Sequence, residues 1–333
     1  MKHTAEQLKE LQSKPLNEKV QISIARIIEW YERWDGQVYV SFSGGKDSTV
    51  LLHLVRSIYP DVPAVFSDTG LEFPELRDFV KTFDNVTWIK PKLAFTEVIK
   101  KYGYPMISKN VAHKIRAYRD GKKWPIPYME GTATNNDGSK SWYCCDKYKY
   151  IAEADFDTGE YCCNIMKKNP LHKYDRDSGR KAILGIMADE GPLRRKEWLQ
   201  NGCNAFDGTY PSSKPMSFWT EQDVIQYIQK YNLKYAPVYG DIVNVNGKLK
   251  FSNIQRTGCV FCGFGCHLEK QPNRFQVLAK THPQLYDYCM RGGQHDENGK
   301  WIPDKGLGMA HVLDYIGIPY EPYNDKKEEL NED

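Results

Sequence analysis

The sequence has no long hydrophobic stretch. No run among its 333 residues approaches the ~18 consecutive apolar residues of a transmembrane helix, so no membrane span is expected. The first residues, MKHTAEQLKEL, hold no basic segment followed by an apolar one, so no secretory leader is expected either. The formal net charge of +3 is too small to predict a general affinity for polyanions. Internal repeats and low-complexity tracts are also lacking. The length suits one large domain or two unequal ones with an ample core.

Cysteine, by contrast, is plentiful. Nine cysteines without a secretory leader favour a reducing compartment, and metal or redox chemistry before disulfides. We therefore expect a cytoplasmic protein in which several cysteines have a chemical role.

One stretch, residues 38–58, combines the signals of a strand, a tight turn and a helix. It reads VYVSFSGGKDSTVLLHLVRSI, with β-branched and apolar residues first and helically spaced apolar residues last. Gly44 and Gly45 let the backbone turn so that N–H groups and the following helix start point at one anion, and Lys46 adds positive charge. The spacing differs from the Walker pattern. An ordinary strand–turn–helix corner is the alternative, but the flanking Ser43, Asp47 and Ser48 favour a phosphate-binding loop.

Further strands and helices place this loop in an α/β protein. Helices are expected at 4–34 (broken near Pro15), 74–83, 95–102, 111–118, 220–231, 272–281, 283–291 and 306–316. Strands are expected at 62–66, 86–89 and 181–188, and a hairpin at 241–252. Strands and helices that alternate in this order predict a doubly wound, mostly parallel sheet. Asp68, Thr69 and Gly70 end the second strand, where such sheets bind ligands.

Residues 109–124 form a basic and aromatic region. It is either a solvated surface or a contact for a phosphorylated substrate or nucleic acid.

The loop and the strand that follows it resemble a known family. Ser-Gly-Gly-Lys-Asp-Ser after a strand resembles the signature of PP-loop nucleotide-binding enzymes, and residues 65–75, VFSDTGLEFPE, are similar to the phosphoadenosine phosphosulfate (PAPS) reductase branch. The resemblance extends over roughly residues 37–265 and includes Gly185, Ile186, Glu190 and Arg194. Met187 and Gly191 depart from it, because the family has arginine and serine there.

The resemblance implies a set of site residues. ATP, PAPS or adenylylsulfate is expected to bind, with Mg²⁺, through Ser43, Gly44, Gly45, Lys46, Asp47, Ser48, Asp68, Thr69, Gly70, Gly185 and Glu190. Lys46, Asp47, Asp68 and Arg194 are the expected catalytic residues, and the two aspartates suit the magnesium ion.

The cysteines suggest a metal centre. Cys259-x-x-Cys262 has a metal-binding spacing that alone allows zinc, a cluster, a redox pair or no bound group at all. Residues 161–171, YCCNIMKKNPL, resemble the segment of adenylylsulfate reductases that binds a [4Fe–4S] cluster. The resemblance implies Cys162, Cys163, Cys259 and Cys262 as ligands. Because the carboxyl ends of the strands also carry the loop, we expect the cluster close to the nucleotide's α-phosphate, with Cys266 as the substitute should only one of Cys162 and Cys163 reach the metal. Zinc, aided by Cys266 and His267, is the second choice.

The remaining cysteines have weaker assignments. Cys144 and Cys145 form a second vicinal pair of undetermined role. Cys203 and Cys289 are expected to be structural or incidental.

The reaction is expected to be adenylation followed by sulfur transfer. Reductases of the family use a cysteine in a C-terminal Glu-Cys-Gly-(Ile or Leu)-His segment, and the nearest counterpart here, Gly265-Cys266-His267-Leu268-Glu269, lies too close to the expected cluster ligands. Relatives that form AMP and pyrophosphate while thiolating tRNA or DNA are therefore the first expectation, with a cysteine desulfurase or thiol carrier as partner. A thiol-dependent reductase releasing sulfite, and a non-catalytic nucleotide-binding protein with structural zinc, are the alternatives.

The expected domain division follows these assignments. It has an N-terminal helical segment (1–36), a nucleotide-binding domain (37–240), a hairpin and helical region with the Cys-x-x-Cys (241–323) and a disordered tail (324–333). The oligomeric state stays open.

Overall fold

The computed structural model describes residues 2–324, so all but one residue of the tail predicted at 324–333 lie outside the described residues. Its internal contacts separate two compact units. Unit 1 contains the residues up to Pro91 together with Lys167–Gly258, and unit 2 contains Lys92–Met166 together with the residues from Cys259 onward. The chain thus passes between the units three times.

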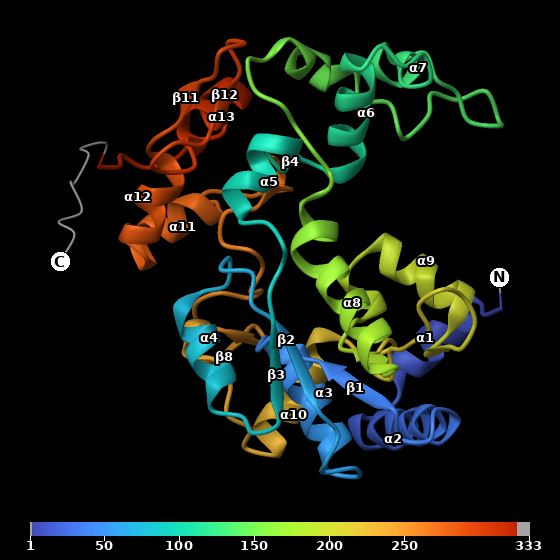
Figure 1. Ribbon diagram of the computed structural model, residues 1–333. Helices are drawn as coiled ribbons and strands as arrows, with labels where there is room; N and C mark the ends of the chain where they lie inside the picture. The colour runs from blue at the N-terminus through green and yellow to red at the C-terminus, as the bar shows by residue number, and fades with distance from the viewer. Residues whose placement is uncertain (1, 325–333) are drawn as a thin grey trace. The chain divides into compact units, whose positions relative to one another are not determined.

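Unit 1 is built on a six-stranded sheet, coloured blue to yellow in Figure 1. Its strands, in spatial order, are β3 (Val86–Ile89), β2 (Ala64–Ser67), β1 (Val38–Ser41), β5 (Lys181–Leu184), β7 (Ser212–Ser213) and β6 (Asn204–Ala205). Every neighbouring pair is parallel except β6 with β7. The order runs outward from β1 to β3 and then resumes with β5 on the other side of β1. This reversal is the hallmark of a doubly wound sheet, so the predicted α/β fold is confirmed.

Helices cover both faces of this sheet. The helices of unit 1 are α1 (Ala5–Ser13), α2 (Leu16–Arg33), α3 (Lys46–Arg56), α4 (Pro74–Lys81), α8 (Asn169–Ser178), α9 (Pro192–Asn201) and α10 (Glu221–Lys230). Leu171 and Tyr174 of α8 pack on one face, against Tyr39, Val65 and Ala182. In β1 the residues Val38, Tyr39 and Val40 are all buried, as expected of a parallel strand enclosed on both sides.

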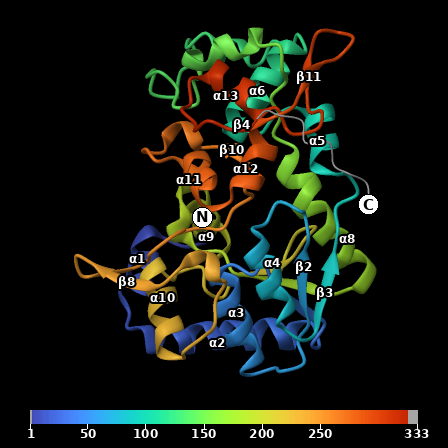
Figure 2. The same ribbon diagram turned by 90° about the vertical axis from the view of Figure 1, so that its left-hand side faces the viewer.

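The N-terminal helices and the hairpin belong to the same unit as the sheet. Lys19 of α2 forms a 2.7 Å ion pair with Asp223 of α10. The hairpin of β8 (Ile242–Val245) and β9 (Lys248–Phe251), orange in Figure 2, is held by two hydrogen bonds between Gln222 and Leu249. The compact units therefore divide the chain differently from the predicted segments 1–36, 37–240 and 241–323.

Unit 2 combines two distant parts of the chain. Its elements are α5 (Phe95–Tyr102), β4 (Met106–Ile107), α6 (Lys109–Arg119), α7 (Ile126–Met129), β10 (Gly263–Phe264), α11 (Arg274–Thr281), α12 (Pro283–Met290), β11 (Gln294–His295), β12 (Trp301–Ile302) and α13 (Met309–Ile316). Parallel pairing of β4 with β10 joins the two parts. Short 3₁₀ or π segments complete both units: Asp146–Glu153, Asn164–Lys168, Ala188–Glu190, Pro237–Tyr239 and Cys266–Leu268.

Most predicted elements are confirmed, and one is wrong in length. The strand predicted to run to Ala188 ends at Leu184. A Cβ atom at Gly185 would lie 3.2 Å from the carbonyl oxygen of Asp47, so the chain passes close to the start of α3 here and leaves the sheet. Among the described residues, no helix combines the length and the apolar character needed to cross a bilayer.

Candidate functional site

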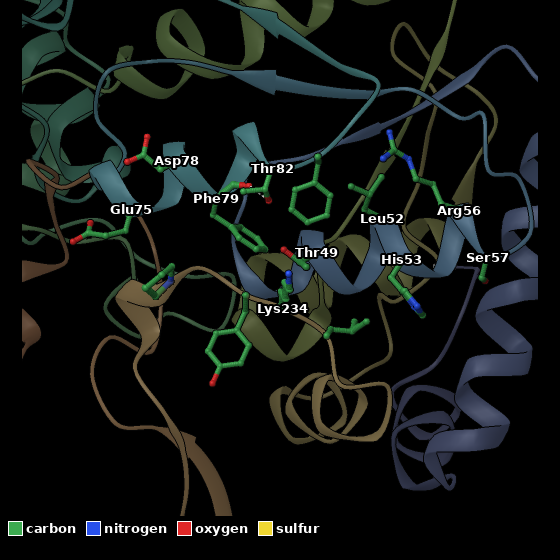
Figure 3. A pocket seen from close by; sticks show the side chains of 14 residues that line it. Thr49, Leu52, His53, Arg56, Ser57, Glu75, Asp78, Phe79, Thr82 and Lys234 are labelled. Atoms are coloured by element: carbon green, nitrogen blue, oxygen red, sulfur yellow. Dashed lines mark hydrogen bonds between the residues drawn. The ribbon is translucent and has the colours of Figure 1, made fainter.

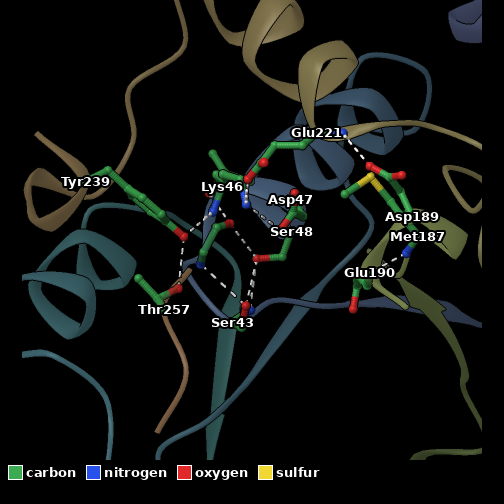
Figure 4. A network of polar contacts seen from close by, with 12 residues as sticks. Ser43, Lys46, Asp47, Ser48, Met187, Asp189, Glu190, Glu221, Tyr239 and Thr257 are labelled. Atoms are coloured by element: carbon green, nitrogen blue, oxygen red, sulfur yellow. Dashed lines mark hydrogen bonds and ion pairs between the residues drawn. The ribbon is translucent and has the colours of Figure 1, made fainter. Parts of the chain in front are cut away.

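The predicted phosphate-binding loop joins β1 to α3 at the switch point of the sheet. Gly44 has φ +72°, and a Cβ atom there would lie 2.6 Å from Val80 of α4, so a side chain would both strain and collide. The Ser48 hydroxyl donates to the carbonyl oxygen of Gly45 at 2.9 Å and accepts the N–H of Ser43 at 3.2 Å (Figure 4). The loop is therefore closed on itself by Ser48, which ends the Lys-Asp-Ser turn at the start of α3.

Lys46 is a buried cation at the start of α3. It is 3% exposed, and its Nζ lies 3.4 Å from Oδ2 of Asp47 and 3.5 Å from Oε1 of Glu221. Burial alone would lower the pKa of Lys46, but Asp47, Tyr239 and Glu221 outweigh it and the pKa is raised. The loop thus keeps its positive charge at neutral pH.

Two carboxylates each have one buried oxygen without a partner: Asp47 lies in the first turn of α3, and Asp68 directly follows β2. Oδ1 of Asp47 and Oδ1 of Asp68 are buried and have no hydrogen-bond partner. Their other oxygens contact Lys46 and, at 3.0 Å, Arg77. Buried polar atoms without a partner are uncommon, and hard oxygen donors beside a phosphate site are what Mg²⁺ takes. The residues present fit the predicted magnesium ion.

Tyr239 contacts the loop although sequence reasoning did not assign it to the site. Its hydroxyl accepts the backbone N–H of Lys46 at 3.0 Å and lies 2.9 Å from Oγ1 of Thr257 (Figure 4). A Cβ atom at Gly45 would lie 3.0 Å from the Thr257 hydroxyl and 3.2 Å from that of Tyr239, which explains the second glycine. Tyr239 lies within residues 37–265, over which the family resemblance extends, but nothing in the sequence around it pointed at the loop.

The C-terminal end of β5 brings Gly185 and Glu190 to the same side as the loop. Gly185 packs against the start of α3, and Oε1 of Glu190 accepts the backbone N–H of Met187 at 2.8 Å. Asp189 accepts the N–H of Glu221, the residue that contacts Lys46. Sequence reasoning missed Asp189 and Glu221 as neighbours of the loop.

Among the described hydrogen bonds and ion pairs, none joins Thr69, Gly70 or Arg194 to the loop, and the same holds for Asp68 and Glu190. Thr69 hydrogen-bonds Glu72 through its N–H and its hydroxyl, and Gly70 is exposed with φ +72°. Arg194 on α9 lies at the surface, where its described ion pairs are with Glu190 at 3.9 Å and Glu197 at 3.3 Å. Their roles as nucleotide or catalytic contacts stay predictions.

A cavity of about 1050 Å³ lies elsewhere in unit 1 (Figure 3). The side of α3 that bears Leu52, His53 and Arg56 lines it, together with α4 and residues 233–237. None of the predicted site residues lines this cavity, so its size is no evidence for or against the phosphate-binding loop.

The predicted metal-binding cysteines all belong to unit 2. Cys162 and Cys163 begin the helical segment that contains the π turn Asn164–Lys168, and the N–H of Cys262 donates to the carbonyl oxygen of Cys259 at 3.1 Å. A helix start favours thiolates, and a tight turn points two of them in one direction. These donors fit a thiolate-bound metal centre.

The fifth predicted ligand, Cys266, has a different environment. Its thiol is buried and donates to the carbonyl oxygen of Gly263 at 2.8 Å, and burial raises its pKa to about 12. Thiolates around a tetrahedral zinc ion lie about 3.8 Å apart, because each Zn–S bond is about 2.3 Å long. In the described part of the chain, no three cysteine sulfurs lie within 4.8 Å of one another, and this holds for the predicted zinc ligands and the predicted cluster ligands alike.

The basic region at 109–124 is largely occupied by internal contacts. Arg116 pairs with Glu160, and Arg119 donates to Asp157 and to several backbone carbonyls between residues 151 and 156. His113 lies 2.8 Å from Glu160. These side chains support the fold of unit 2. The two arginines are therefore engaged in internal contacts, which argues against their binding a phosphorylated substrate or nucleic acid.

Comparison with models of known protein families identifies the family of the chain. The model of the phosphoadenosine phosphosulfate reductase domain matches residues 37–120 and 133–264, which is more than half of the chain. The chain belongs to this family. The predicted family membership is confirmed, and so is the expectation that the protein is an enzyme.

The relatives of this protein within the PAPS reductase family differ in sequence identity and in the share of the chain that they match. The adenosine 5'-phosphosulfate reductase of Lysinibacillus sphaericus is 26% identical over 217 residues, covering 64% of this chain and 72% of the reductase. An uncharacterized protein of Methanocaldococcus jannaschii is 40% identical over 314 residues, covering 88% of this chain and 59% of the archaeal protein.

A solved relative adds little to the assignment. The PAPS reductase of Candida auris, in a phosphate complex, is 15% identical with a TM-score of 0.39, covering 74% of this chain and 98% of the reductase. A likeness at this level identifies no reaction, so the family model is the basis of the assignment.

Proposed function

We propose that the protein binds Mg²⁺–ATP at the loop between β1 and α3, adenylates an acceptor with release of pyrophosphate, and passes sulfur to that acceptor. The observation that supports this is the combination of a buried Lys46 cation with two carboxylate oxygens, on Asp47 and Asp68, that lack hydrogen-bond partners. A cation and a metal on the same phosphates neutralise the charge that develops when the bond between the α and β phosphates breaks. Ser43, Gly44, Gly45 and Ser48 bind the phosphates in this scheme.

The proposed chemistry has two steps. An oxygen of the acceptor attacks the α-phosphorus, the bond to the bridging oxygen breaks, and pyrophosphate leaves with the electron pair while the acceptor's proton is released to water. The terminal sulfur of a persulfide then displaces AMP, and a second thiol cleaves the S–S bond, being oxidised to a disulfide. A tRNA or DNA acceptor, and a cysteine desulfurase or thiol carrier as sulfur source, fit this scheme.

The two cysteine pairs are the proposed ligands of a [4Fe–4S] cluster, which would supply an open, Lewis-acidic iron for holding sulfur where only three of the four cysteines bind it. Cys162, Cys163, Cys259 and Cys262 are its proposed ligands.

Cysteine burial favours transfer over reduction. A reductase of this type needs a nucleophilic thiolate, yet burial raises the pKa of both Cys266 and Cys289, the two cysteines that follow the Cys-x-x-Cys. Met187 and Gly191 also replace two residues that the family uses with its sulfonucleotide. The thiol-dependent reductase remains the second candidate, because named relatives such as that of Lysinibacillus sphaericus are adenosine 5'-phosphosulfate reductases.

One assay separates these reactions. The protein, purified anaerobically, is incubated with ATP and Mg²⁺ and with bulk tRNA or DNA, and AMP and pyrophosphate are quantified. In parallel, sulfite is measured with adenylylsulfate or PAPS and reduced thioredoxin. We expect AMP and pyrophosphate in equal amounts and no sulfite above the level without enzyme; thioredoxin-dependent sulfite from either sulfonucleotide would reverse the ranking.

A pair of lysine variants tests the assignment of the loop. Lys46→Met removes a buried charge-assisted contact worth about 1.5–3 kcal/mol, so ATP affinity should fall roughly 10- to 100-fold. Lys196→Met changes an exposed lysine of unit 1 and should leave it unchanged. Equal ATP affinity in the Lys46 variant and the parent, measured by calorimetry on folded protein, would refute the loop as the nucleotide site.

A further inference from the structure

Unit 2 contains a second cluster of metal-type donors, outside the phosphate-binding loop and the cysteines. Asp155, His295 and His311 place one ligand atom each within 4.8 Å of the others. His295 lies in β11, His311 in α13, and Asp155 shortly after the 3₁₀ segment Asp146–Glu153; β11 and α13 are labelled together in red in Figure 1. The three residues come from distant parts of the sequence, so the fold alone assembles them.

The distances are close to those of a metal site. Nε2 of His295 lies 2.8 Å from Oδ2 of Asp155, and Nε2 of His311 lies 2.8 Å from Oδ1. Around a tetrahedral zinc ion, donors at about 2.0–2.1 Å from the metal are about 3.3 Å apart. An outward movement of roughly half an ångström would therefore convert these contacts into coordination of one ion.

The charge of the cluster also suits a cation. Among the described residues, the ion pairs of Asp155 are with the two histidines, which carry a charge only when protonated. The neighbouring cation Lys300 pairs instead with Asp157. With neutral imidazoles the cluster has one negative charge and two nitrogen donors directed at it.

A tightly placed tryptophan forms one wall of the cluster. The Trp301 ring stacks on His311 at 4.3 Å, and its indole N–H donates to the carbonyl oxygen of Gly308 at 3.0 Å. A Cβ atom at Gly293 would lie 2.3 Å from this ring, so only glycine admits it. His311 is thereby held in orientation, as a ligand in a prepared site must be.

Solvent can reach the cluster. The side chains of Asp155, His295 and His311 are 33%, 50% and 35% exposed. An ion can therefore enter, and a coordination position remains for water.

We propose that Asp155, His295 and His311 bind one divalent transition-metal ion of the zinc class, with water completing the coordination. Two imidazoles and one carboxylate are a known donor set for zinc and for iron(II). The ion links the β11–β12 hairpin and α13 to the chain around residue 155. This site is independent of the proposed nucleotide chemistry, and the ordinary alternative is a carboxylate that only receives two hydrogen bonds.

Cobalt(II) is the probe that separates this site from the cysteines. The full chain, isolated anaerobically so that its cysteines keep whatever metal they hold, is treated with EDTA, desalted and titrated with Co²⁺. Coordination by nitrogen and oxygen gives only weak visible bands, whereas coordination by thiolate adds an intense near-ultraviolet band. We expect one Co²⁺ per chain with the weak bands alone, displaced by Zn²⁺.

Histidine variants make the result specific. His295→Gln and His311→Gln should each weaken Co²⁺ binding at least tenfold. His113→Gln is the matched control, because His113 also contacts a carboxylate, Glu160 at 2.8 Å, but has Arg116 rather than a second imidazole beside it. Binding as tight in the His295 and His311 variants as in the parent would overturn the proposal.

The stacked indole supplies a second measurement should a histidine variant fold poorly. Co²⁺ bound at the cluster should quench Trp301, so Trp301→Phe should bind Co²⁺ while losing part of the quenching seen in the parent. Unchanged quenching in Trp301→Phe would place the ion elsewhere and refute the site.

Discussion

The hydroxyl of Tyr239 accepts a hydrogen bond from the backbone N–H of Lys46, at 3.0 Å. This N–H belongs to the first turn of α3, whose unsatisfied donors form an anion site. A phenol oxygen from a residue 193 positions away thus occupies a donor that a nucleotide phosphate would use. Binding of a phosphate there would compete with the tyrosine.

The first prediction follows from that competition. Tyr239→Phe leaves the Lys46 N–H without its acceptor, so the free energy of unfolding without nucleotide should fall by about 1–2 kcal/mol. Because a phosphate oxygen can take the vacated donor, ATP should stabilise the variant more than it stabilises the parent. Urea unfolding with and without Mg²⁺–ATP measures both quantities.

The control for this variant is Tyr235→Phe, at a neighbouring tyrosine that packs edge-on to Tyr239. It should respond to ATP like the parent. If ATP stabilises the Tyr239 variant less than the parent, the phenol assists nucleotide binding instead of competing with it.

A second prediction concerns the burial of Asp47. Burial raises the pKa of this carboxyl above its usual value of 3.8, and nearby Lys46 only partly opposes the shift. The folded protein therefore holds the Asp47 proton more tightly than the unfolded chain, so ionised Asp47 destabilises the fold as the pH rises above about 4. Asp47→Asn, which mimics the protonated form, should be more stable than the parent at pH 7 and match it at the acid end.

Unfolding in urea between pH 4 and pH 8 measures this difference. Asp61→Asn, at an exposed position of unit 1, is the control and should follow the parent at every pH. Loss of Mg²⁺-dependent ATP binding in the more stable Asp47 variant would show that the carboxylate is kept for function at a cost in stability. An Asp47 variant less stable than the parent at pH 7 would contradict the pKa shift.

The parts of the fold and site that sequence reasoning predicted are those encoded locally. Gly44, Gly45 and Lys46 lie between a strand and a helix that each have clear periodicity, so both the loop and its position in the sheet could be read directly. The helix α8 was missed because Pro170 and its polar sequence break the helical pattern, and the π turn before it accommodates the change.

Contacts between distant segments were not predictable. Tyr239 meets Lys46, and His295 meets Asp155, only because the chain folds back over more than a hundred residues. No short-range spacing encodes such pairs. The compact units were missed for the same reason, since the pairing of β4 with β10 links residues 106–107 to residues 263–264.

A third prediction tests the attachment of the N-terminal helices. The ion pair of Lys19 with Asp223 is buried, with side chains 3% and 9% exposed, and loss of one partner from a buried pair costs about 3–5 kcal/mol. Thr220 still hydrogen-bonds Asp223 when the lysine is gone, so the free energy of unfolding should fall by about 3 kcal/mol in Lys19→Met. Lys14→Met breaks the exposed ion pair with Glu18 and should change the free energy of unfolding by less than about 1 kcal/mol. Equal losses in both variants would mean that α2 is attached without help from the buried pair.

The last prediction concerns the cysteines, whose environments differ enough to distinguish ligands from bystanders. Cys259 and Cys262 share a tight turn, and Cys162 and Cys163 begin a helix, so all four can present thiolates. After anaerobic purification, Cys→Ser at Cys259 or Cys262 should abolish iron and sulfide, and Cys→Ser at 162 or 163 should lower both. Cys289→Ser is the control, since that thiol is fully buried in α12 and should leave iron unchanged.

Cys266 decides between two forms of this centre. Its thiol donates to the carbonyl oxygen of Gly263, and the high pKa that burial imposes opposes thiolate formation unless a metal displaces the proton. If Cys266→Ser keeps full iron, the vicinal pair supplies the remaining ligands; if it loses iron while one of Cys162→Ser and Cys163→Ser keeps it, the spared cysteine is available to accept sulfur. Stoichiometric zinc without iron in the parent, prepared from iron-replete cells, would refute the cluster, as would full iron in the Cys259 and Cys262 variants.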